Sequence, residues 1–301
     1  MPEEFVKQHI VPKRYLDRFT FLKNGKPVVG VRLNTDSEPK YFTSPTDKVG
    51  YVKNIYDVTD KDDPKYWEHY LCDEFDTLCG RPLENIISKI TLTPKGKRVL
   101  NDADKDIIGK IITSQLVRTP ENIEYSYSIY PDIEKRAKES FVNMFPKSEQ
   151  GKIRDRIKNV RFDNETVKEI YLNKSFSQKL FNHLLDIIKQ RPWAVYVSNL
   201  KNTLPFITSD NPVVVYDPCR KLSGVFHVGL NSVTSVIYFP LSPSIAIEIY
   251  SNIDSNTVGN VDGIKYTIDD KSFISRMNIK ETTQAFNHTF LPEPIYNVFS
   301  K

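Results

Sequence analysis

The 301-residue sequence lacks the signatures of several common enzyme classes. It contains no G-x-x-x-x-G-K-S/T phosphate loop, no G-x-G-x-x-G dinucleotide loop, no G-x-S-x-G nucleophile turn and no H-E-x-x-H zinc motif. P-loop nucleotide hydrolases, dinucleotide-dependent dehydrogenases, serine hydrolases of the nucleophile-turn type and zinc proteases of the H-E-x-x-H type therefore lose support. Any active site has to be found from scattered polar residues.

Cysteine is scarce, with Cys72, Cys79 and Cys219 as its three occurrences. Three cysteines cannot form a complete disulfide framework, and their spacing is not that of zinc ligands. Cys72 and Cys79 are separated by two turns of a predicted helix, about 10 Å of rise, so we expect no bridge between them. No stretch approaches the roughly 20 apolar residues of a membrane span, and the first residues lack a basic and an apolar signal region. The sequence predicts a cytoplasmic protein.

An excess of one charge is also missing, because 42 basic residues stand against 38 acidic ones. The net charge of +4 is compatible with a nucleic-acid partner and far from diagnostic. With 39% hydrophobic and 12% aromatic residues, the chain can bury a sizeable core. We predict a single α+β domain over residues 1–301, with three successive parts. They are a motif helix and β meander (1–60), a helical region (61–190) and a β-rich region with a late helix (191–301).

What the sequence does contain is a dense polar motif over residues 8–19, Q-H-I-V-P-K-R-Y-L-D-R-F. Proline is favoured at a helix start, so Pro12 predicts a helix that begins there. Gln8 and His9 immediately precede that helix, where free backbone N–H groups favour an anion. The helix is expected to separate an apolar stripe from a basic face, formed respectively by Tyr15, Leu16 and Phe19 and by Arg14 and Arg18.

Periodicity predicts the remaining elements. Residues 21–56 alternate as a short antiparallel meander with a turn at 23–26. Helical spacing is expected over 64–90, 103–119 and most of 121–190, with breaks near Gly80 and near Ser175 or Ser177 and with Asp102 or Asp104 as a cap. After residue 192 the period becomes two, which predicts an antiparallel sheet. Its strands are expected at 193–197, 204–208 paired with 213–216, 233–239 and 245–250.

Gln115 and Arg118 stand out on the helix predicted at 103–119. Gln115 continues a stripe of four isoleucines, and an amide on a buried face costs free energy unless it is paired. One interpretation is a structural clamp, in which Gln115 satisfies a neighbouring loop and Arg118 pairs with an acidic group. The other places both side chains in a pocket with His9 and Asp210, whose turn at 208–212 is also an ordinary Asx-Pro turn.

The motifs taken together resemble the bacterial domain of unknown function family 4238. The resemblance rests on Q-H-x-V-P-x-x-Y-L-x-x-F at 8–19, Q-x-x-R-T-P at 115–120 and T-S-D-N-P at 208–212. Other matching positions follow in order along the chain, namely 54–56, Trp193, 239–243, Asn278 and Ala285. The family usually has glutamate at an acidic helix position, for which Asp76 is the best match and Glu74 and Glu84 are competitors.

The resemblance implies which residues form a site. The family has no agreed activity, so the roles come from residue chemistry, with catalysis assigned to His9, Asp76, Gln115 and Asp210 and substrate binding to Gln8, Arg14, Arg118 and Asn211. Asp76 and Asp210 are the candidate ligands of Mg²⁺ or Mn²⁺. These residue types fit a metal-dependent nuclease or nucleotide phosphohydrolase in an accessory or phage-defence role. The alternatives are a non-catalytic binding or sensor module for an anionic ligand, such as a nucleotide or nucleic acid, and a partner-dependent structural component.

Overall fold

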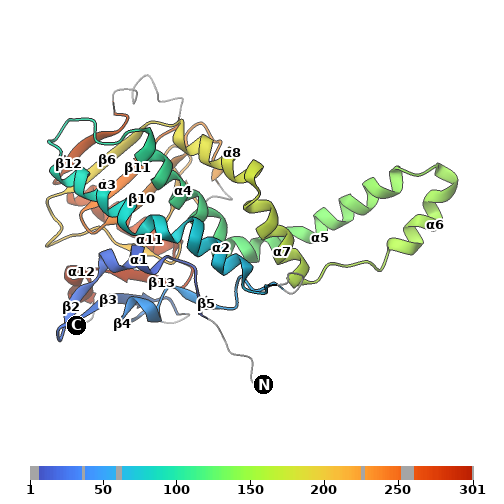
Figure 1. Cartoon of the computed structure of the whole chain (residues 1–301), viewed down its shortest axis with the longest axis horizontal. Helices are drawn as coiled ribbons and strands as arrows, with labels where there is room; N and C mark the ends of the chain where they lie inside the picture. Colours follow the sequence, from blue (N-terminus) through green and yellow to red (C-terminus); the bar gives the residue numbers. More distant parts are fainter. Residues whose placement is uncertain (1–6, 36–37, 59–62, 225–227, 252–260, 300–301) are drawn as a thin grey trace.

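The structure is a computed structural model that describes residues 7–35, 38–58, 63–224, 228–251 and 261–299. Figure 1 shows β-sheets and helices gathered in a body, from which α5 (Pro120–Asn143) and α6 (Lys147–Ile157) extend as an arm. In the described part of the chain, no helix combines the length and apolarity needed to cross a membrane. The predicted α+β fold, with N-terminal strands, a helical middle and a C-terminal sheet, is confirmed.

The N-terminal meander consists of β2 (Phe21–Lys23), β3 (Lys26–Leu33) and β4 (Lys40–Ser44). Asn24 and Gly25 have positive φ angles in the turn between β2 and β3, a conformation that asparagine and glycine tolerate. The sequence did not predict that β3 also pairs with β13 (His288–Leu291), which pairs in turn with β7 (Thr208–Ser209). The two ends of the chain thus share one sheet.

The motif at 8–19 folds into a short strand and a short helix. The strand is β1 (Lys7–His9), which pairs antiparallel with β5 (Tyr51–Lys53). Pro12 is the N-cap of α1 (Lys13–Leu16), and a 3-10 turn over Asp17–Phe19 follows. A second 3-10 turn, Thr46–Lys48, precedes β5. Tyr15, Leu16 and Phe19 are buried and Arg14 is exposed, as their spacing predicts.

The helical middle begins with α2 (Tyr66–Glu74) and α3 (Arg81–Leu92), separated by the 3-10 turn Asp76–Cys79. The predicted break therefore lies at Gly80, the N-cap of α3. For α4 (Asp102–Arg118), the predicted cap at Asp102 or Asp104 is wrong. Asn101 is the N-cap, because its extended backbone lets its side chain accept the N–H of Asp104, whose carboxylate accepts the N–H of Asn101 in return.

Two further helices, α7 (Asn164–Ser175) and α8 (Gln178–Lys189), follow the arm. The predicted interruption lies between them, where the hydroxyl of Ser177 accepts the N–H of Leu180 and so caps α8. Cys72 and Cys79 are both free, one exposed and one buried, which confirms that they do not bridge.

The C-terminal sheet has the order β12-β6-β11-β10-β8-β9 and is antiparallel except for the parallel pair β12 and β6. Its strands are β6 (Trp193–Ser198), β8 (Val214–Asp217), β9 (Leu222–Ser223), β10 (Val236–Ser242), β11 (Ile245–Ile249) and β12 (Ile264–Ile268). The late helix is α11 (Lys271–Gln284), and α12 (Glu293–Phe299) ends the described chain. The main core cluster draws on residues from all three parts, including Leu16, Leu71 and Ile247.

The predicted pairing of 204–208 with 213–216 is wrong, because β7 and β8 belong to different sheets. The turn between them is held against the chain that leads into β13. Asp210 accepts the backbone N–H groups of Phe286, Asn287 and His288, each at 2.8 Å. This anchorage directs β7 onto β13 and leaves β8 to pair with β10.

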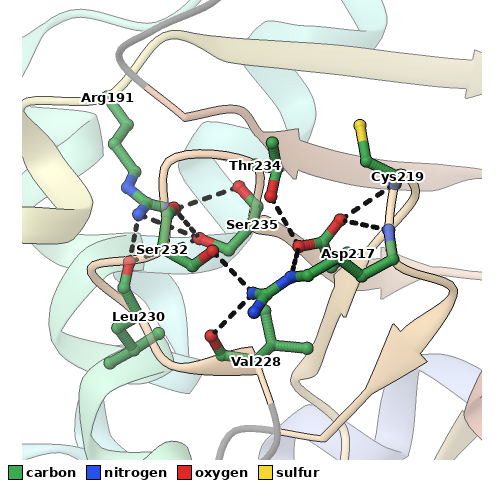
Figure 2. A network of polar contacts seen from close by, with 9 residues as sticks. Arg191, Asp217, Cys219, Val228, Leu230, Ser232, Thr234 and Ser235 are labelled. Atoms are coloured by element: carbon green, nitrogen blue, oxygen red, sulfur yellow. Dashed lines mark hydrogen bonds and ion pairs between the residues drawn. The ribbon is translucent and has the colours of Figure 1, made fainter.

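A polar network fixes the loop after β8, as Figure 2 shows. Asp217 is buried and accepts the backbone N–H groups of Cys219 and Arg220, both at 2.9 Å. These hydrogen bonds, together with those from the Thr234 hydroxyl and the Arg220 guanidinium, hold the pKa of Asp217 below its usual range. Arg191, just before β6, donates to Ser235. The network ties the loop to the sheet and leaves its charged groups satisfied.

Candidate functional site

Gln8 is buried and serves the backbone around it. Its amide oxygen accepts the N–H of Tyr56 at 2.7 Å, and its amide nitrogen donates to the Asp57 carboxylate at 2.5 Å. Both partners lie in the segment that follows β5, three and four residues after its last residue. Gln8, predicted as a substrate-binding residue, thus clamps β1 to this segment and fixes the backbone of its neighbour His9.

Arg118, the last residue of α4, is fully buried and forms the centre of a cluster. Its Nε donates to the carbonyl oxygen of Ile10 at 3.0 Å, and its Nη1 lies 2.6 Å from Oδ1 of Asp76. Burial opposes the charge, but the Asp76 carboxylate outweighs it, so the pKa of Arg118 is raised. Of the three acidic positions considered from the sequence, Asp76 is the one that pairs with Arg118, whereas Glu84 lines a neighbouring cavity.

Gln115 lies one turn before Arg118 and is also buried. With its amide oriented to suit its neighbours, its oxygen lies 2.9 Å from Nε and 3.0 Å from Nη2 of Arg118. Its nitrogen then lies 3.2 Å from the carbonyl oxygen of Ile10. Gln115 and Arg118 therefore share one backbone acceptor, and their hydrogen bonds match the structural clamp rather than a direct contact with substrate.

His9 differs from Gln8, Gln115 and Arg118 because a polar atom of its side chain is left without a hydrogen bond in the described part of the chain. Its backbone lies in β1, and its ring nitrogen Nε2 is buried without a hydrogen-bond partner among the described residues. Burial lowers the pKa of His9, and Arg118 lowers it further against the opposing effect of Asp76. The ring is therefore neutral at pH 7, with a nitrogen that can accept or donate one proton.

Glu68, on α2, joins the cluster and was missed in the sequence. Burial raises the pKa of its carboxyl group to about 7, and the backbone N–H of His9 acts in the opposite direction. Arg118 opposes that rise and Asp76 adds to it. Glu68 stands beside the buried residues Trp67 and Leu71. The sequence signal that could have identified Glu68 is its place as a charged residue at the edge of the predicted apolar face of this helix.

Asp210 and Asn211 lie outside this cluster. The carboxylate of Asp210 is occupied by backbone N–H groups of residues 286–288, and Asn211 donates to Glu121 at 2.9 Å. The structure thus brings His9, Asp76, Gln115 and Arg118 together. The hydrogen bonds of Asp210 and Asn211 instead go to residues 286–288 and to Glu121.

The predicted metal pair does not fit these contacts. Asp76 gives one oxygen to Arg118, and both oxygens of Asp210 already accept hydrogen bonds. Across residues 7–299, apart from the segments outside the description, no group of three or more His, Cys, Asp or Glu side chains is arranged to hold a metal ion. The metal requirement stays a prediction, and no catalytic step below depends on it.

Arg14 lines a cavity of about 860 Å³ beside the cluster. Four basic side chains and two acidic ones line it, namely Arg14, Arg18, Arg81 and Lys201 and Asp17 and Glu84. Arg18 is partly committed, since it donates to the carbonyl oxygens of Cys79 and Gly80. The turn Asp76–Cys79 links the two features, because Asp76 pairs with Arg118 and Cys79 lines the cavity. A cavity with excess positive charge favours an anionic ligand.

The fold and the cluster define an α+β protein with a candidate acid–base site beside a basic cavity. A family model described as "Protein of unknown function (DUF4238)" matches residues 7–300, so the chain belongs to this family. This confirms the resemblance seen in the motifs. The comparisons with curated proteins and with solved structures gave no match.

Proposed function

We propose that His9 and Glu68 form the acid–base pair of a hydrolase that cleaves phosphate esters in nucleic acids or nucleotides. The observation that carries the proposal is the buried, unpartnered Nε2 of His9 in a cluster with Glu68, whose pKa is about 7. The lowered pKa of His9 favours its neutral, basic form, and the raised pKa of Glu68 favours its neutral, acidic form at the same pH. Opposed shifts of this kind are typical of catalytic acid–base pairs.

The chemistry follows from these protonation states. Neutral His9 takes a proton from the water that attacks phosphorus, and a new P–O bond forms as the ester P–O bond breaks. Protonated Glu68 gives its proton to the leaving oxygen. The proton on His9 then returns through solvent to Glu68, which restores both groups. Arg118 and Asp76 hold the loop at Ile10 in place and act as positioning residues.

The phosphate chain is assigned to the basic cavity, where Arg14, Arg81 and Lys201 supply positive charge. His9 and Glu68 do not line this cavity, so the proposal requires the scissile ester to extend from it past the turn Asp76–Cys79 to the His9 cluster. Guanidinium groups bind phosphate oxygens in a bidentate manner, which favours a phosphate ester over a carboxylic ester. A divalent cation and a phage-defence role stay proposals that follow from the motifs. Activity measured with Mg²⁺, with Mn²⁺ and with EDTA tests the first of them.

The second candidate is a non-catalytic module that binds an anionic ligand. The same basic cavity favours it, because a binding site needs the cations and not the acid–base pair. In that case Arg14→Gln combined with Arg81→Gln abolishes the thermal shift produced by a nucleotide, while His9→Ala leaves it intact.

The proposed hydrolysis predicts a large loss of activity in two variants. His9→Ala and Glu68→Gln are expected to lower kcat by about 10²- to 10⁴-fold, because each removes one proton-transfer partner. The controls are His183→Ala and Glu74→Gln, which change the same residue types at exposed positions of α8 and α2. The assay follows cleavage of labelled DNA and RNA, nucleoside triphosphates and an aryl phosphodiester. Absence of turnover with all of these, or equal activity of variants and controls, would contradict the proposal.

The same pair sets the pH dependence. Catalysis needs neutral His9, whose pKa lies below 6.5, and protonated Glu68, whose pKa is about 7. The value of kcat/KM should therefore rise through the lowered pKa of His9 and fall above about pH 7, as Glu68 ionises. Glu68→Gln should lose the falling limb. A profile that keeps rising from pH 6 to 9 would show that Glu68 is not the acid.

A further inference from the structure

Positive charge gathers in the outer part of the arm, whereas α5 has more acidic than basic residues. Residues 144–161 contain six basic and two acidic residues, a net charge of +4 that equals the formal net charge of the protein. The helix α6 within this segment has no buried residue, and Figure 1 shows it extended away from the body. A helix without a buried face gains little from packing on its own chain. Its charge therefore serves solubility or an anionic partner.

A cavity at the base of this segment distinguishes between those two uses. It has a volume of about 570 Å³ and lies between α5 and residues 158–167. Three aromatic residues line it, Tyr127, Tyr130 and Phe162, with Tyr130 and Phe162 in edge-to-face contact at 6.1 Å. Such a volume is that of a small-molecule site, and aromatic faces are what nucleobases stack on.

The charges around the cavity are ordered by one buried carboxylate. Glu134 accepts hydrogen bonds from Lys138 at 2.7 Å and from Arg161 at 3.1 Å. This carboxylate also accepts the backbone N–H of Phe162, so it fixes the segment that carries the aromatic ring. Lys135 and Lys158 also line the cavity, together with Asp132, and Lys158 forms an exposed ion pair with Asp155 at 3.7 Å. An exposed pair of this kind is weak, so both lysines can still meet an anionic group at the edge of the aromatic surface.

We propose that the arm is a binding site for single-stranded nucleic acid. The cavity takes one unpaired base against Tyr130 and Phe162, and the basic residues of α6 follow the phosphates that continue from it. A mononucleotide would use the cavity and leave the charge along α6 without a role, whereas a duplex would not offer an unstacked base. The site goes beyond the proposed hydrolysis, because it includes no residue of the His9 cluster.

The test is fluorescence anisotropy with a labelled 12-nucleotide DNA strand, carried out with the full chain in EDTA. Tyr130→Ala combined with Phe162→Ala is expected to weaken binding at least fivefold, because it removes the stacking surface. Phe141→Ala is the matched control, since this arm aromatic is exposed and does not line the cavity. Lys152→Gln with Arg156→Gln should weaken binding and make the slope of log K against log salt shallower by about 1.4, through two lost phosphate contacts. Lys174→Gln with Lys179→Gln, outside the arm, controls for charge.

Each outcome of this test is decisive. The proposal is overturned if the strand does not bind at low salt, or if the variant lacking both rings binds as the wild type does. It is equally overturned if a duplex of the same sequence competes as well as the single strand, because the arm would then be a general polyanion surface. Unchanged circular dichroism of the variants shows that the arm is still folded. Binding without cleavage would support this site while contradicting the proposed hydrolysis, so the two can fail separately.

Discussion

Replacing Arg118 with methionine is expected to lower the free energy of unfolding by about 3–5 kcal/mol. The guanidinium is fully buried and pairs with Asp76, while its Nε satisfies the carbonyl oxygen of Ile10. Removing it leaves a carboxylate that is mostly buried and has lost its counter-charge. It also removes both hydrogen bonds of Arg118 to the Gln115 oxygen. The loss of one partner of a buried pair costs more than the pair contributes, because the other charge is stranded.

Urea unfolding followed by circular dichroism measures this effect. Arg14→Met is the matched control, because it makes the same substitution at an exposed position of α1, and it should change stability by no more than about 0.5 kcal/mol. Arg118→Met combined with Asp76→Leu should recover part of the loss, since no unpaired charge remains. Equal stability of Arg118→Met and Arg14→Met would show that the cluster does not hold the N-terminal motif in place.

Asp210→Ala is expected to cost about 3–5 kcal/mol as well, although Asp210 lies outside the His9 cluster. The substitution strands three backbone N–H groups, those of Phe286, Asn287 and His288, which the carboxylate accepts at 2.8 Å. It thereby frees the turn between β7 and β8 from the chain that enters β13. Hydrogen bonds to a buried charged group are among the strongest in a protein.

The same unfolding assay tests Asp210, with Asp73→Ala as the control at an exposed position of α2. Asp210→Asn should be nearly as destabilising, because an amide offers one acceptor oxygen and turns N–H groups toward other donors. A stability change below about 1 kcal/mol, together with a loss of catalysis, would place Asp210 in the active site and contradict the structural role inferred from its hydrogen bonds.

Local patterns in the sequence predicted the local structure well. The turn at Asn24 and Gly25, the break at Gly80 and the cap at Ser177 follow from residues that are close together in the chain. The wrong cap predicted for α4 is also a local error. Asn101, Asp102 and Asp104 could each cap the helix from their residue type, and the extended backbone of Asn101 makes it the N-cap. Such features depend on residue types and their immediate neighbours.

Local sequence patterns could not predict which strands pair or which residues form the site, because both depend on segments far apart in the chain. The pairing of β3 with β13 joins residues more than 250 positions apart, and the separation of β7 from β8 depends on the backbone around Asn287. The motif resemblance grouped His9, Arg118 and Asp210; Arg118 binds the backbone of Ile10, next to His9, whereas Asp210 binds a different part of the backbone. Glu68 was missed because its raised pKa arises from burial and from neighbours supplied by other segments.

The fold lowers the pKa of His9 and raises that of Glu68, so that a neutral base and a neutral acid occur together near pH 7. The most direct measurement is an NMR pH titration of the His9 ring and of the Glu68 carboxyl carbon, assigned with His9→Ala and Glu68→Gln. We expect a pKa of about 7 for Glu68 and a pKa below 6.5 for His9. A Glu68 carboxyl that titrates near 4.5, with His9 at 6.5 or above, would contradict this expectation.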